Sequence, residues 1–123
     1  MIWNRRLWMR LGVVNALCSL AVGLVAMRAD APVATLLRLG AQFQFMHSLA
    51  IFACAAFMMI GASAARHAPA LFLTGSVIFS GTLYARAATL AVGGDITLAV
   101  GAALLAAGWG VLLVSSATID SET

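Results

Sequence analysis

The sequence predicts an all-α membrane protein, a four-transmembrane-helix bundle with a short interfacial helix between the first and second spans. Hydrophobic residues make up 63% of the 123 residues and charged residues only 9%, and the mean hydropathy is +1.05. Polar groups are therefore too few to cover a water-soluble surface. A spanning helix needs roughly 20 apolar residues, so this length accommodates about four of them. We expect one integral membrane domain over residues 1–123.

The first span is predicted over residues 7–27, directly after Arg5 and Arg6. A basic start, an apolar middle and the small residues at 29–31 also occur in signal peptides. The apolar run is longer than the roughly 7–15 residues of a signal-peptide core, which favours a transmembrane helix.

A short amphipathic helix is expected over residues 32–44. Asp30 and Pro32 are typical of a helix N-cap and first turn, and apolar residues follow them at helical spacing. This pattern suggests a helix lying at the membrane interface. It leads directly into the second span, predicted over residues 45–65.

The second and third spans are expected to be antiparallel neighbours, because the connection at 66–69 is very short. The third span is predicted over residues 69–85. The glycine pair at 93–94 is expected to break the chain, and Asp95 to cap the fourth span over residues 96–115.

Charge and cysteine usage narrow the possible partners. The net charge of +3 comes with seven basic residues, all arginine, scattered at the ends of apolar runs. This distribution indicates membrane anchoring, and no nucleic-acid partner is expected because no single basic face is present. Cys18 and Cys54 both fall inside apolar spans and predict neither a disulfide framework nor a zinc site.

Arginine placement favours both termini on the cytoplasmic side of a bacterial inner membrane. Arginines clustered before a first span usually dominate orientation. The cytoplasmic group is then Arg5, Arg6, Arg10 and Arg66, and the opposite group is Arg28, Arg38 and Arg86.

Small residues at helical spacing are expected to form contacts within the bundle, because helices in lipid associate through close packing and interhelical hydrogen bonds; a specialised dimerisation face is the alternative. Asn15 is predicted near mid-membrane, where an unpaired amide is costly, and a serine of the third span is its expected partner. The small residues are Gly12, Ser19 and Gly23 in the first span, Gly75, Ser76, Ser80 and Gly81 in the third, and Ala102, Ala106 and Gly110 in the fourth.

One polar concentration is available for a specific interaction, at the outer end of the predicted bundle. His47 is its sharpest member, because a histidine can titrate near neutral pH, donate to a carbonyl or bind a metal. A hydrogen-bonded structural role is the more frequent one. Helix caps, an interfacial tyrosine and snorkelling arginines explain much of the remainder. The candidate interaction site comprises His47, Gln44, Tyr84, Arg86 and Asp95, together with Asn15.

No catalytic, cofactor or metal site is predicted. Two-histidine haem ligation within one chain is disfavoured, because His47 and His67 would lie about 30 Å apart along one helix. Paired carboxylates, HExxH, GxSxG and phosphate-binding glycine loops do not occur in the sequence.

Four segments carry a family resemblance. They are Gly-Val-Val-Asn at 12–15, Phe-Gln-Phe-Met-His-Ser-Leu at 43–49, Phe-Ser-Gly-Thr-Leu-Tyr at 79–84 and Ala-Gly-Trp at 107–109. In this order they resemble the small bacterial inner-membrane proteins catalogued as domain of unknown function 423, whose eukaryotic relatives are also small transmembrane proteins.

The resemblance implies four transmembrane helices and no established activity. It places Asn15, His47 and Tyr84 at the family's recurrent polar positions. A histidine expected at the end of the first span is replaced around Met27-Arg28, which disfavours a two-histidine site, and the family's Thr-Pro turn appears as Thr97-Leu98.

The sequence is compatible with two functions. The preferred one is a non-enzymatic accessory, structural or assembly component of a larger membrane complex, with membrane lipids and either a membrane-protein partner or further copies of itself around it. A respiratory complex is one candidate host. The alternative is a small oligomeric transporter or channel, although the carboxylates Asp30, Asp95, Asp120 and Glu122 all fall outside the predicted spans.

Overall fold

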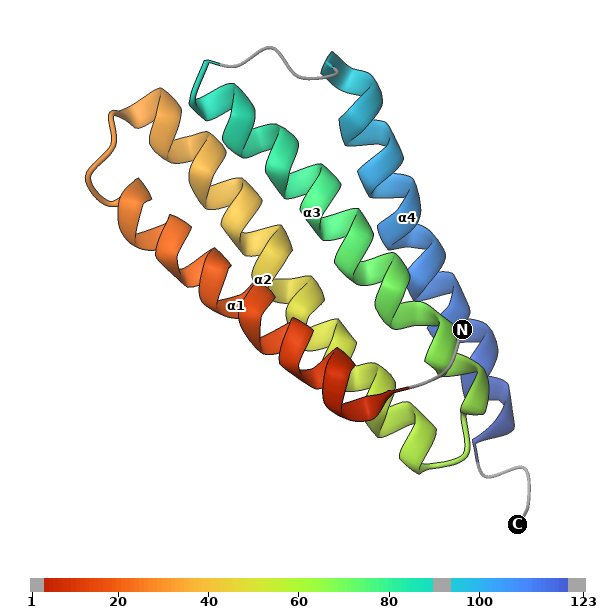
Figure 1. Cartoon of the computed structure of the whole chain (residues 1–123). Coiled ribbons are helices and arrows are strands. Elements are labelled where there is room, and N and C mark those ends of the chain that lie inside the picture. The colour runs from red at the N-terminus through yellow and green to blue at the C-terminus, as the bar shows by residue number, and fades with distance from the viewer. Residues whose placement is uncertain (1–3, 90–93, 120–123) are drawn as a thin grey trace.

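A computed structural model describes residues 4–89 and 94–119, and these residues form four long helices that run alternately up and down in chain order (Figure 1). All four are long and apolar enough to cross a membrane, which confirms the all-α fold with four transmembrane helices. The protein is thus a multi-pass membrane protein. The helices are α1 (Arg5–Ala26), α2 (Ala31–Met59), α3 (Ala68–Ala87) and α4 (Gly94–Ser115), with short 3-10 helices η1 (Ser63–His67) and η2 (Ser116–Thr118).

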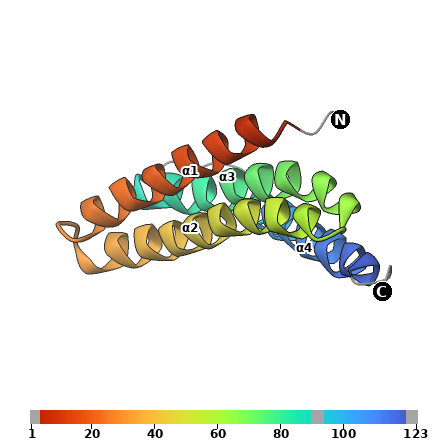
Figure 2. The same ribbon diagram turned by 90° about the horizontal axis from the view of Figure 1, so that it is seen from below.

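The helices pack mainly on their neighbours in sequence. α1 packs on α2, α2 on α3 and α3 on α4, so α1 and α4 lie at opposite edges of a layer (Figures 1 and 2). The expected antiparallel contact between the second and third spans is confirmed. Because α2 and α3 have helices on two sides, they are more buried than α1 and α4, whose outer faces expose many large apolar side chains. These two outer faces are the surfaces that meet lipid or other proteins.

The interfacial helix expected over 32–44 is not a separate element, because it continues without a break into the second span as α2 (Ala31–Met59). Asp30 is the N-cap and Pro32 lies in the first turn, as expected, although the Asp30 side chain makes no capping hydrogen bond. No proline follows Pro32 in α2, so no residue that breaks a helix separates residues 32–44 from the second span. The 29 residues of α2 correspond to about 43 Å, longer than the roughly 30 Å hydrocarbon core, so α2 projects beyond the core or crosses it at a tilt.

The end of the second span also differs from the expected residue 65. α2 ends at Met59, and Gly61 follows with φ +101°, a backbone conformation that favours glycine. The chain then turns through η1 (Ser63–His67). Ala65 within η1 and Ala62 and Ala68 on either side of it are completely buried. Small side chains here let the turn pack tightly under the bundle.

Glycines set the close approach of α3 and α4. A Cβ atom at Gly101 would lie 2.7 Å from the Phe79 backbone nitrogen, and one at Gly108 would lie 2.6 Å from the Phe72 ring. The buried face of α4 is therefore Gly101, Leu105, Gly108 and Leu112. The expected face of Ala102, Ala106 and Gly110 was wrong, because these three residues are exposed on the opposite side.

The glycine at 101 makes a testable contribution to stability. Gly101→Ala is expected to lower the free energy of unfolding by about 1–3 kcal/mol, because the added methyl group meets the α3 backbone. Gly81→Ala is the matched control, since nothing lies within 4 Å of its added Cβ; the helix contact expected at Gly81 was therefore wrong. Unfolding followed by circular dichroism in detergent measures both. Equal stability of the two variants would contradict this account of the α3–α4 contact.

Candidate functional site

The side-chain amide of Asn15 is buried between three helices. Asn15 is only 5% exposed, and its Nδ2 donates to Ser48 Oγ at 2.8 Å and lies 3.3 Å from Ser76 Oγ. Ser76 belongs to α3, which confirms the expected serine partner, while Ser48 of α2 is the shorter contact. The Ser48 hydroxyl in turn donates to the Gln44 carbonyl at 2.9 Å. The Asn15 side-chain amide, which would be costly to bury unpaired, therefore has hydrogen-bond partners on the neighbouring helices.

Gln44 extends this arrangement into a chain across the layer. Its Nε2 donates to Asn15 Oδ1 at 2.8 Å, and its Oε1 accepts the Tyr84 hydroxyl hydrogen at 2.7 Å. The side-chain amide of Gln44, on α2, thus links Asn15 of α1 to Tyr84 of α3. We call Asn15, Gln44, Ser48 and Tyr84 the amide network.

Close backbone contact between α2 and α3 accompanies the amide network. Ser80 Oγ donates to the Gly40 carbonyl oxygen at 2.7 Å. A Cβ atom at Gly40 would lie 2.5 Å from the Tyr84 ring, so glycine at this position leaves the space that the ring occupies. Tyr84 reaches Gln44 because position 40 has no side chain.

His47 lies apart from the amide network, on the side of α2 that faces α4. It is 3% exposed, and its two ring nitrogens are both within hydrogen-bonding distance of a partner. Nδ1 is 2.7 Å from the Phe43 carbonyl oxygen, and Nε2 is 3.2 Å from Trp109 Nε1. A carbonyl can only accept and an indole N–H can only donate, so the neutral imidazole carries its hydrogen on Nδ1. His47 therefore ties α2 to α4 as a structural group.

The ring of Phe72 lies between these two helices. Its centroid is 5.7 Å from that of His47 and 5.1 Å from that of Trp109, with the Trp109 ring edge-on. Trp109 remains 45% exposed. The indole N–H would be unpaired in hydrocarbon without His47, so this hydrogen bond satisfies the one polar atom of an otherwise lipid-facing side chain.

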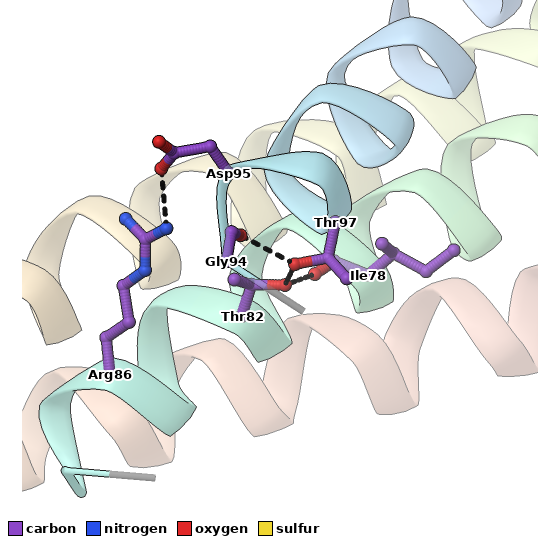
Figure 3. A network of polar contacts seen from close by, with 6 residues as sticks. All are labelled: Ile78, Thr82, Arg86, Gly94, Asp95 and Thr97. Carbon is purple, nitrogen blue, oxygen red and sulfur yellow. Dashed lines mark hydrogen bonds and ion pairs between the residues drawn. The ribbon is translucent and has the colours of Figure 1, made fainter. Parts of the chain in front are cut away.

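Arg86 and Asp95 form a third group, at the end of the bundle where α3 is followed by α4 (Figure 3). Arg86 Nη2 lies 2.8 Å from Asp95 Oδ1, and the Asp95 side chain is 96% exposed. Beneath this ion pair the hydroxyls of Thr82 and Thr97 are hydrogen-bonded to each other at 2.8 Å. Asp95 was expected to cap a helix that begins at residue 96, but α4 begins at Gly94, so Asp95 lies in its first turn and stabilises it through the helix dipole. The expected break at Gly93 lies outside the described residues.

The structure thus divides the six candidate residues into three separate groups. Gln44 and His47 do not lie at the outer end of the bundle, because α2 begins at Ala31 and places His47 about 24 Å along its axis. Arg86 and Asp95 do lie at that end. The sequence did not predict the bonding roles of Ser48 and Trp109, although both residues lie in the segments that carry the family resemblance. An indole in the middle of the fourth apolar run requires a hydrogen-bond acceptor, and that signal would have pointed to Trp109.

The described residues suit structural bonding better than catalysis. Within residues 4–89 and 94–119, no group of three or more histidine, cysteine, aspartate or glutamate residues is placed to hold a metal ion. Both nitrogens of His47 are engaged by protein atoms, so neither is free for a ligand in this arrangement. Asn15, Gln44 and His47 each bond to a group on another helix, whereas Ser19 and Ser115 bond only within their own helices.

Comparison with known proteins gives one match. The sequence model of one family, described as "Protein of unknown function (DUF423)", matches residues 21–101, from the last third of α1 into α4. Neither the curated proteins nor the solved structures yielded a match. The matched range includes Gln44, His47 and Tyr84 and begins after Asn15.

Because the amide network joins three helices, we expect substitutions of its members to have coupled effects on the free energy of unfolding. Asn15→Ala is expected to lower the free energy of unfolding by about 1–2 kcal/mol, because it leaves the Gln44 amide without its acceptor. Its effect and that of Tyr84→Phe should be non-additive in a double-mutant cycle in detergent. Ser19→Ala is the control, because Ser19 is equally buried but donates only to Ala16 within α1. Additive losses would contradict a connected network.

The hydrogen bonds of His47 predict its tautomer, which NMR can test. ¹⁵N NMR of the histidine-labelled protein should show a protonated Nδ1 and an unprotonated Nε2 for His47 at neutral pH, because Trp109 donates to Nε2. Trp109→Phe should shift the Nε2 resonance, while the resonances of His67, which lies in η1, should be unchanged. A protonated Nε2 in the unmodified protein would refute the assignment.

Proposed function

The chain belongs to the DUF423 family of proteins of unknown function, and we propose that it is a non-enzymatic accessory or assembly component of a larger complex in the bacterial inner membrane. One observation gives the main support for this proposal. The side chains that a reaction or a transport path would use are bonded to groups of neighbouring helices: Asn15, Gln44 and Tyr84 form one chain, and His47 bonds to Trp109. These bonds hold the layer together. The outer faces are then the parts of the described bundle available to a partner.

The outer face of α4 supports the same proposal. A ridge of small exposed residues runs along it, opposite the face that packs on α3. Small residues let the backbone of another transmembrane helix approach closely. A groove of about 600 Å³ continues the ridge toward η1, and its lining includes Ala64, His67 and Val114. We define the α4 ridge as Ala102, Ala103, Ala106, Ala107 and Gly110.

The position of α4 at the edge of the layer makes this face accessible. A partner helix could pack there in the same manner as α3 packs on the other side, without displacing any helix of the chain (Figure 1). The space around Gly110 is open, since nothing lies within 4 Å of an added Cβ. The α4 ridge is therefore the surface on which we place the membrane-protein partner.

Arginine positions support an orientation for the proposed subunit. Arg5, Arg6 and Arg10 begin α1, and Arg66 lies in η1 at the same end of the bundle. At the opposite end, Arg86 pairs with Asp95, whereas Arg28 and Arg38 have no carboxylate partner among the described residues; four arginines at the first end thus stand against three at this one. Under the positive-inside rule, we propose that the end with the start of α1 and the end of α4 faces the cytoplasm.

The transporter alternative gains no comparable support. Proton-coupled export generally uses a carboxylate within the membrane. Of the four carboxylates, Asp30 is the N-cap residue of α2 and Asp95 lies in the first turn of α4, both at helix ends. Asp120 and Glu122 lie outside the described residues. We therefore retain the accessory role as the proposal.

Purification from native membranes in mild detergent tests the proposal. The unmodified chain is expected to retain a stoichiometric membrane-protein partner, and Ala106→Leu combined with Gly110→Leu should abolish that retention, because two bulky side chains block close helix approach. Ala21→Leu, on the exposed face of α1, is the matched control and should retain the partner.

Two results would count against the proposal. A chain that consistently purifies alone, with no stoichiometric partner, contradicts the accessory role. A partner retained equally by the α4 double variant and by Ala21→Leu contradicts the placement of the interface on α4. Unfolding curves of both variants in detergent separate loss of binding from loss of folding.

A further inference from the structure

A groove between α1 and α2 remains unfilled by the chain itself. It has a volume of about 360 Å³, and its walls are apolar except for Gln42 and the Ser19 hydroxyl, which already donates to Ala16. Nothing lies within 4 Å of a Cβ built on Gly23, so the close helix contact expected there was wrong and the groove is open at this point. The α1–α2 groove is lined by Ser19, Leu20, Gly23, Leu24, Ala41, Gln42 and Phe45.

Gln42 is the unusual member of this lining. Its side chain is exposed, and it makes no hydrogen bond to any residue of 4–89 or 94–119. Gln44, two positions along, has both ends of its amide bonded. An amide without a partner is costly in an apolar medium, and Gln42 lies between the exposed apolar residues Leu39 and Phe45. A partner from outside the chain would satisfy it.

Polarity increases along α2 from the groove toward the outer end of the bundle. Phe45, Gln42 and Arg38 fall at helical spacing on one exposed face, and Arg38 lies about 6 Å beyond Gln42 along the axis. Side chains of a helix lean toward its N-terminus, so Gln42 and Arg38 both lean toward the membrane surface. An apolar wall, an amide and a cation therefore follow one another in that order.

A second arginine, Arg28, lies in the connection between α1 and α2, at the same end of the bundle as Arg38; we call this region the α1–α2 corner. Arg28 lines an adjoining apolar hollow with Leu24, a residue that the hollow shares with the α1–α2 groove. Neither Arg28 nor Arg38 pairs with a carboxylate among the described residues, whose one ion pair joins Arg86 to Asp95. Asp30 supplies the nearest negative charge in sequence, so two arginines against one carboxylate leave the corner positive.

We propose that the α1–α2 groove binds an anionic phospholipid, with one acyl chain in the groove, the Gln42 amide on an ester carbonyl, and the phosphate at Arg38 and Arg28. The order of groups along the groove matches the order of groups in the lipid: chain, ester, phosphate. The unbalanced positive charge favours a lipid with a net negative headgroup over a zwitterionic one.

A second copy of the chain fits this surface less well. A two-fold contact centred on Gln42 would repeat every residue across the axis and bring the two Arg38 side chains toward each other. Like charges brought together at the edge of a membrane oppose such a contact, whereas a phosphate neutralises them. The proposal concerns the α1 side of the layer and does not depend on the partner surface of α4.

Native mass spectrometry of the purified full-length chain in detergent tests the headgroup contact, with phosphatidylglycerol and phosphatidylcholine as probes. The unmodified protein should retain phosphatidylglycerol preferentially. Arg38→Gln should lower that retention about five-fold, as expected for one arginine at a membrane surface. Arg86→Gln is the matched control, since Arg86 lies at the same end of the bundle but pairs with Asp95. It should leave retention unchanged.

A second pair of variants tests the acyl-chain position. Gly23→Leu fills the α1–α2 groove and should lower retention of both lipids, whereas Gly81→Leu adds the same side chain at another open position on α3 and should not. Equal retention of the two lipids by the unmodified protein would overturn the proposal, as would no effect of Arg38→Gln. A dimer that Gly23→Leu dissociates would overturn it in favour of self-association.

Discussion

Gln44 of α2 donates a hydrogen bond to Asn15 of α1, and the rest of the layer depends on this bond. Lipid tails are as apolar as leucine, so apolar side chains gain little by facing another helix in place of lipid. A buried amide differs, because separating it from its partner in hydrocarbon leaves polar atoms unsatisfied. The bond therefore fixes which faces of α1 and α2 meet, and Tyr84 extends the same constraint to α3.

The register set by the amide network determines the other contacts. With α2 and α3 held at Gly40 and Ser80, α3 presents Phe72 and Phe79 to the glycines of α4. That close approach brings Trp109 to His47 across the Phe72 ring. Hydrogen bonds thus position the first three helices, and glycine packing together with the His47–Trp109 hydrogen bond positions the fourth. Both are short-range forces that remain effective in lipid.

The two edges of the layer differ in chemistry. α4 presents small side chains and a continuous apolar ridge, which suits another helix. The α1–α2 edge presents an apolar groove with an unbonded amide and arginines above it, which suits an amphiphile. A small protein of this shape can lie between a larger assembly on one side and the surrounding bilayer on the other.

The sequence by itself determined the number of helices, their approximate positions and the need of Asn15 for a partner, because hydropathy and the cost of a buried amide are local properties. It did not determine that residues 32–44 continue into α2. Amphipathic spacing is the same in a surface helix and in the packed end of a long one. Only the tertiary structure decided that Gln44 joins the amide network while His47 faces Trp109, since their separation depends on which neighbour each face of α2 meets. The buried face of α4 was decided in the same way: small residues lie on both sides of this helix, and the shape of α3 selects Gly101 and Gly108.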